Sequence, residues 1–187
     1  SAAAPLVSGV IALMLEANPE LGYRDVQTIL AYSAKQMNPA GFKINGAQNW
    51  NGGGLHISHE QGFGVVDAHA AVRLAESWEQ EPQTADNEVS VVASGETSGT
   101  IPDANAKGLE FSTVIEEAIT TEWAEVELNV QHDRIADLEI ELISPSGTIA
   151  RLIDRPTVND KNPMGASNLP DRIVFTTSAS LFRGESS

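Results

Sequence analysis

The sequence has 187 residues, 41% of them hydrophobic, a formal net charge of −15 and no cysteine. Residues 1–78 carry a formal charge of −2, and residues 79–187 carry −13. An acidic surface repels nucleic-acid phosphates and anionic membranes, so neither is expected as a partner, whereas cationic peptides or divalent cations would be attracted. Without cysteine there are no disulfides, thiol nucleophiles or thiolate metal sites. No apolar run approaches the roughly 20 residues needed to span a bilayer.

The chain opens with an apolar segment. Residues 5–17 are hydrophobic on nearly all sides, which predicts a short helix buried inside a larger core. Pro5 suits the first turn of that helix, because its missing N–H costs nothing there. Asn18 and Pro19 predict the end of the helix.

A second helix is predicted over residues 23–37, with Asp25 favourably placed in its first turn. The apolar residues of this segment recur at helical spacing, so one face is expected to be buried. That face comprises Val26, Ile29, Leu30, Ser33, Ala34 and Met37.

Residues 38–64 are rich in Asn and Gly and predict loops. Asp67 predicts the cap of a third helix, from about Ala68 to Trp78. This helix is expected to bury Ala71, Leu74, Ala75 and Trp78. Residues 79–87 contain almost nothing to bury and predict a linker.

Beyond the linker the hydrophobic period changes from helical to strand-like. Residues 125–131 and 137–143 alternate polar and apolar side chains, which predicts two half-buried strands. Ser-Pro-Ser-Gly at 144–147 predicts a turn, residues 148–153 a returning strand, and residues 173–175 a further strand. Short strands separated by polar turns are typical of an antiparallel sandwich or barrel. The residues expected inward are Val126, Leu128, Val130, Leu138, Ile140 and Leu142.

Several motifs resemble one enzyme family. Residues 1–5, Ser-Ala-Ala-Ala-Pro, precede Val-Ser-Gly and an apolar helix, and this order resembles the segment around the nucleophile of subtilisin-like serine proteases. Residues 15–19, 23–27 and 58–68 are similar to the closing helices of kexin and furin catalytic domains. Residues 137–148, with Leu-Ile-Ser-Pro-Ser-Gly-Thr at their end, resemble the P domain, the jelly-roll-like sandwich that follows those catalytic domains.

The resemblance implies an α/β fold class: the C-terminal helices of a subtilisin-like catalytic domain, followed by an all-β jelly-roll-like P domain. On this interpretation the peptidase part covers residues 1–78, the linker 79–87 and the P domain 88–187. We expect the sequence to be truncated at both ends. The family's Asp, its His in a His-Gly-Thr segment and its oxyanion Asn precede the serine, and none of the four histidines here lies in such a segment.

Ser1 is the candidate catalytic residue. A serine hydroxyl needs a histidine to take its proton and a carboxylate to orient that histidine. The N-terminus of a helix offers unpaired N–H groups and a positive dipole end, which stabilise a developing oxyanion, and the backbone N–H of Ser1 would be one donor. The alternative is that Ser1 is only a helix cap, as serine often is.

Two places in the chain could supply metal ligands. His56 and His59 are three residues apart, a spacing that can place two imidazoles on one metal, but a structural role is the preferred interpretation. His69 and His132 are isolated and are expected at the surface. Three carboxylates with i, i+2 spacing could gather calcium, although the solvated face of a strand is preferred. They are Asp137, Glu139 and Glu141.

The sequence therefore predicts part of a secreted or periplasmic serine endopeptidase that forms an acyl-enzyme on Ser1 and, by resemblance, cuts after basic residues. No cofactor-binding or metal residue is assigned in the chain, and calcium is expected for the whole protein by resemblance. The expected partners are a peptide or protein substrate and, within the molecule, the P domain packed on the catalytic domain. The alternatives are a non-catalytic binding or structural β-sandwich module and a pseudoprotease. By itself the chain is expected to be inactive.

Overall fold

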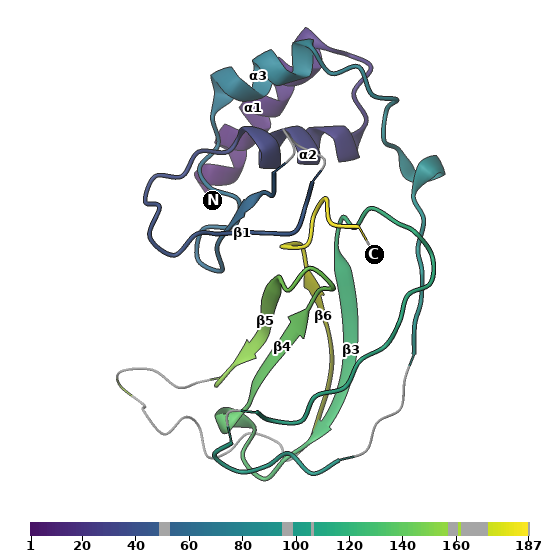
Figure 1. Ribbon diagram of the computed structural model, residues 1–187. Helices are drawn as coiled ribbons and strands as arrows, with labels where there is room; N and C mark the ends of the chain where they lie inside the picture. The colour runs from purple at the N-terminus through teal and green to yellow at the C-terminus, as the bar shows by residue number, and fades with distance from the viewer. Residues whose placement is uncertain (49–52, 95–98, 106, 157–160, 162–171, 187) are drawn as a thin grey trace.

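The computed structural model describes residues 1–187 except 49–52, 95–98, 106, 157–160, 162–171 and 187. Three helices gather at one end of the molecule, and two antiparallel β-ribbons form the other end (Figure 1). We call residues 1–78 the helical region and residues 120–186 the β region. Between them, the described residues of 79–119 form one short 3₁₀ turn, η1 (Ala85–Asn87), and otherwise neither helix nor strand.

The core of the helical region lies where α1 (Ala3–Ala17), α2 (Tyr23–Ser33) and α3 (Ala68–Glu76) meet. Its buried residues are Met14, Val26, Ile29, Ala71 and Ala75. Small alanines on α3 let the other two helices approach closely, and Leu74 and Trp78 cover the edge of the cluster. The expected third helix is present, although it ends at Glu76 rather than Trp78, and Leu74 and Trp78 are half-buried. Its cap is confirmed, since the Asp67 carboxylate accepts a hydrogen bond from Ala70 N–H at 3.0 Å.

The first helix is confirmed as a helix, but the prediction that it is buried all round does not hold within this chain. Met14 is its one buried residue, while Leu6 is 72% exposed and Leu13 50% exposed. The residues of α1 that pack in or against the three-helix cluster are Val10, Ile11 and Met14, and Leu6, one turn before Val10, is largely exposed. Pro5 lies in the first turn and Asn18 caps the C-terminus, as expected.

The second helix ends earlier than predicted, at Ser33 rather than at residue 37. Lys35 is instead extended and exchanges two backbone hydrogen bonds with Val65, at 2.8 and 2.9 Å. This pairing draws the chain out of the helix, so Met37 is 72% exposed instead of joining the apolar face. Asp25 is in the first turn, as predicted.

The loop segment between α2 and α3 contains a small antiparallel pair, β1 (Lys43–Ile44) and β2 (His56–Ile57). Behind it Ala47, Leu55 and Ile57 form a second buried cluster, with Tyr32, Phe63 and Leu181 packed against it. Since Leu181 is close to the C-terminus, this cluster joins the helical region to the β region.

The β region consists of two antiparallel ribbons. In the first, β3 (Ala124–Gln131) pairs with β6 (Arg172–Ala179); in the second, β4 (Glu139–Ile143) pairs with β5 (Ile149–Asp154). The ribbons lie side by side (Figure 1), and β5 lies close to β6. All four predicted strands are present. The strand expected at 137–143 begins two residues late, because Ile135–Asp137 forms a 3₁₀ turn, η2.

Side chains on β3 alternate as the sequence predicts. Val126, Leu128 and Val130 are half-buried, and the intervening residues are exposed. Ile140 and Leu142 alternate likewise with exposed neighbours on β4, and Leu138 just before it is 6% exposed. The turn at 144–147 is also confirmed by a hydrogen bond from Gly147 N–H to the Ser144 carbonyl at 2.9 Å. Among the described residues no helix is both long and apolar enough to cross a membrane.

Candidate functional site

Ser1 lies immediately before the start of α1. The N-cap position is Ala2, which makes no side-chain capping hydrogen bond, and the helix proper begins at Ala3. Ser1 is exposed, and within the described part of the chain its hydroxyl makes no hydrogen bond. The serine is therefore not the helix cap, which removes the simplest structural role for it.

The uncapped end of α1 has free hydrogen-bonding capacity. The first N–H groups of a helix have no partner within the helix, and α1 has no acidic residue in its first turn to occupy them. A 15-residue helix also presents the positive end of its dipole at this terminus. A substrate oxygen that gains negative charge beside Ser1 would be stabilised by both effects.

The histidines lie elsewhere. His59 Nε2 accepts a hydrogen bond from Arg151 N–H of β5 at 2.8 Å, and His132 Nδ1 accepts one from Arg134 N–H at 3.0 Å. His56 on β2 and His69 on α3 are exposed. None of these contacts involves Ser1, and His59 connects the helical region to the β region.

The carboxylates near β4 are paired with arginines. Asp137 contacts Arg134 at 2.6 Å and Glu141 contacts Arg151 at 3.4 Å. Glu139 contacts Arg155 at 3.2 Å. Among the described residues no group of three or more His, Asp or Glu side chains could hold a metal ion.

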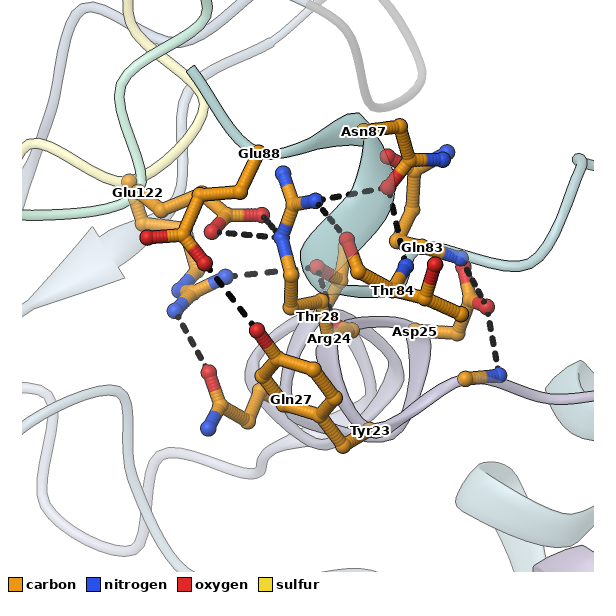
Figure 2. Close-up of polar contacts among 12 residues, drawn as sticks. Tyr23, Arg24, Asp25, Gln27, Thr28, Gln83, Thr84, Asn87, Glu88 and Glu122 are labelled. Atoms are coloured by element: carbon orange, nitrogen blue, oxygen red, sulfur yellow. Dashed lines mark hydrogen bonds and ion pairs between the residues drawn. The ribbon is translucent and has the colours of Figure 1, made fainter. Parts of the chain in front are cut away.

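Besides the contact of His59, two groups of polar contacts among the described residues join the helical region to the rest of the chain, and the first is centred on Arg24 of α2 (Figure 2). The Arg24 Nε donates to both oxygens of Glu122 at 2.8 and 2.9 Å, and its Nη1 donates to the Thr84 carbonyl and to Asn87 Oδ1, each at 2.8 Å. The bond to Glu122 is the main cause that raises the pKa of Arg24. Arg24 thus fastens both the 79–87 segment and the start of the β region to α2.

Asp25, beside it, is fully buried. Its carboxylate accepts hydrogen bonds from Gly22 N–H and Gln83 N–H, both at 2.8 Å, and from Trp78 Nε1 at 3.0 Å. The chain passes so close here that a Cβ on Gly22 would lie 2.4 Å from the Gln83 carbonyl oxygen. The predicted linker is therefore exposed along most of its length but anchored at its centre.

The second contact is centred on the C-terminal turn, residues 180–186. Asn45 Nδ2 donates to the carbonyls of Leu181 at 2.9 Å and Arg183 at 3.0 Å. Arg183 reaches back to α2, where its guanidinium donates to Gln27 Oε1 at 3.1 Å and Thr28 Oγ1 at 3.3 Å. Glu185 is 2% exposed and accepts bonds from both regions. Apart from Asp25 and Trp78, sequence reasoning assigned no individual role to these residues, because their partners are far away along the chain.

The comparisons with known proteins show the same division. Residues 1–64 match the model of the subtilase family, and residues 121–172 match that of the proprotein convertase P-domain. The chain is 36% identical over 169 residues to the PC3-like endoprotease variant B of Hydra vulgaris, covering 87% of this chain and 22% of that protein. It is 36% identical over 170 residues to the human proprotein convertase subtilisin/kexin type 6, covering 87% of this chain and 17% of that protein.

Solved structures give the same fold. A serine protease of Aeromonas sobria, solved in complex with a chaperone, superposes with a TM-score of 0.64 over 96% of this chain and 34% of that chain, at 24% identity. The chain spans about a fifth of the length of the curated relatives it matches. A subtilase segment followed by a P-domain segment, in the order of these relatives, shows that the chain belongs to the subtilisin-like serine proteases of the kexin and furin type.

Proposed function

We propose that the chain supplies the nucleophile of a serine endopeptidase and that Ser1 is that nucleophile. The observation that carries the proposal is an exposed serine just before the uncapped N-terminus of a helix, within the segment that matches the subtilase family. The resemblance of residues 1–5 to the family's nucleophile segment supports the same assignment.

In the proposed reaction the Ser1 Oγ attacks the carbonyl carbon of the scissile peptide bond while a histidine takes its proton. The carbonyl oxygen becomes an oxyanion, stabilised by the N-terminus of α1 and, in the whole protein, by the backbone N–H of Ser1. The protonated histidine then gives its proton to the leaving amine, which leaves an acyl ester on Ser1. Water hydrolyses this ester by the same route.

The histidine and its orienting carboxylate are proposed to come from outside these 187 residues. His59 and His132 accept hydrogen bonds from Arg151 and Arg134, and neither contact involves Ser1. We accordingly propose that the chain is inactive by itself. The relatives are about five times longer, which leaves room for those residues.

We propose the domain division 1–78 for the peptidase part, 79–87 for the linker and 88–187 for the P domain. The P domain packs on the peptidase part through Arg24, Asn45 and the C-terminal turn. The exposed apolar side chains of α1, Leu6, Leu13 and Leu15, support the idea that more of the catalytic domain covers this helix in the whole protein.

The substrate is proposed to be a peptide or protein cut after basic residues, and the enzyme to be secreted, extracellular or periplasmic. The net charge of −15 supports attraction of cationic peptides. Calcium is implied for the whole protein by the family. The described residues offer no cluster that could hold a metal ion, so we assign no calcium site among them. We also assign no step of the reaction to calcium.

The direct kinetic test is Ser1→Ala in the whole protein, with Ser8→Ala as the matched control. Ser8 is an exposed serine of the same helix whose hydroxyl bonds only the Ala4 carbonyl, at 3.0 Å. We expect Ser1→Ala to lower kcat by at least about three orders of magnitude. Ser8→Ala should leave kcat within about twofold, because it removes only a hydroxyl that bonds a carbonyl of its own helix. Equal turnover of correctly folded Ser1→Ala and wild type would contradict the assignment, and a wild-type protein without peptidase activity would indicate a pseudoprotease.

A further inference from the structure

A nearly fully buried carboxylate lies at the boundary between the helical region and the β region. Glu185, in the C-terminal turn, accepts a hydrogen bond from Gly46 N–H at 2.8 Å and others from the hydroxyls of Ser146 at 2.8 Å and Thr148 at 2.5 Å. Gly46 follows β1 in the helical region, whereas the two hydroxyls belong to the turn between β4 and β5. One side chain therefore connects three segments that are distant in sequence.

Among the described residues, the donors that face Glu185 are neutral, namely a backbone amide and the hydroxyls of serine and threonine. A buried charge is costly unless hydrogen bonds satisfy it, and charge-assisted hydrogen bonds are the strong ones. No buried side-chain nitrogen or oxygen among the described residues lacks a partner. Replacing the carboxylate would consequently take the charged acceptor away from the buried Thr148 hydroxyl on one side of the boundary and from the half-buried Gly46 N–H on the other.

The helical region and the β region also contact each other directly at Gly46 and Ser146. A Cβ on Gly46 would lie 2.1 Å from Ser146 Oγ and 2.2 Å from Ser146 Cβ, so only glycine fits between loop and turn. The preceding residue, Asn45, bonds two carbonyls of the C-terminal turn, and its Oδ1 accepts from Leu55 N–H at 2.7 Å. The contact thus extends from the C-terminal turn to the start of β2.

We propose that the Glu185 carboxylate holds the helical region and the β region together at this boundary. It is a positioning group that holds residues 45–48 and 53–57, the 144–148 turn and the C-terminal turn together. When the carboxylate is neutralised, these segments open together while the core formed by the three helices stays closed. The proposal does not depend on the catalytic role of Ser1.

The test is hydrogen exchange, measured by mass spectrometry, on the whole protein carrying Glu185→Gln. We expect amide exchange to speed up at least tenfold in described residues 45–48 and 53–57, in 144–148 and in 180–186, and to stay unchanged in α2 and α3. The matched control is Glu127→Gln, an exposed carboxylate on β3 of the same region, which should leave all of these unchanged. The proposal would be overturned if amide exchange at residues 45–48 were unchanged in Glu185→Gln, or if exchange became faster by the same factor throughout the chain.

A milder variant keeps the proposal testable if Glu185→Gln does not yield folded protein. Ser146→Ala removes one donor to the carboxylate and should speed exchange in the same three segments, by a smaller factor. Combined with Glu185→Gln, where that variant folds, Ser146→Ala should add little, because both substitutions remove the same contact. Unchanged exchange in Ser146→Ala, or full additivity of the two substitutions, would contradict the proposal.

Discussion

The helical region and the β region bury their side chains in different ways. In the helical region, residues from three consecutive helices meet in an apolar cluster, with Met14 and Ile29 fully buried. In the β region the inward side chains of β3 are only half-buried, the buried cluster consists of Ala150 and Phe182 with half-buried neighbours, and Arg183 and Glu185 are buried at the boundary. The described β region therefore depends on the helical region for part of its buried surface.

The largest effect is expected in the helical core, from Met14→Ala. Removing a fully buried methionine side chain should cost about 2–5 kcal/mol of unfolding free energy, through lost burial and the cavity left behind. Met37→Ala, at a position 72% exposed, should change stability by no more than about 0.5 kcal/mol. Denaturant unfolding of both variants checks this. Equal losses would mean that Met14 is not the centre of this core.

A smaller effect is expected on β3, from Leu128→Asp. The substitution places a carboxylate among half-buried aliphatic side chains and should cost at least about 2 kcal/mol. Glu127→Ala, on the opposite face of the same strand, should shift stability by about 0.5 kcal/mol or less. If the two variants melt alike, the inward face of β3 has been assigned wrongly.

The features that could be predicted are those that depend on residues close together in the sequence. The cap at Asp67 and the alternation of β3 can be recognised from neighbouring residues, and both are confirmed. The early end of α2 is missed because it depends on Val65, which pairs with Lys35 from 30 residues away. Burial of α1 is predicted from its apolar composition, yet composition does not tell which residues pack against a helix.

The boundary contacts could not be predicted for the same reason. Glu185 meets donors that are 37, 39 and 139 residues away, and Arg24 meets a glutamate 98 residues away. In the sequence both are ordinary charged residues, and nothing nearby marks them as buried. By contrast, Ser1 stands out because its neighbours form a motif, although its assigned role remains a proposal.

The smallest effect is expected from acid. Burial opposes ionisation of Glu185, but hydrogen bonds from Ser144, Thr148, Gly46 and Ser146 outweigh it and hold the pKa below its ordinary value of 4.5. The carboxylate therefore stabilises the folded state fully above about pH 4.5, and this contribution is lost as the pH falls through the lower, folded pKa. Thermal melts below pH 4.5 should lose less stability with falling pH in Glu185→Gln than in wild type. Identical pH profiles would contradict the role of this carboxylate.

The most direct test of the central claim, that Ser1 is the nucleophile of a serine endopeptidase, is labelling with a fluorophosphonate and mapping of the label by peptide mass spectrometry. The whole protein should take up one label per molecule, on Ser1, because only a serine activated by a base reacts readily. The 187-residue chain by itself should take up none. Labelling of the whole protein at another serine, or no labelling of a correctly folded protein, would contradict the account.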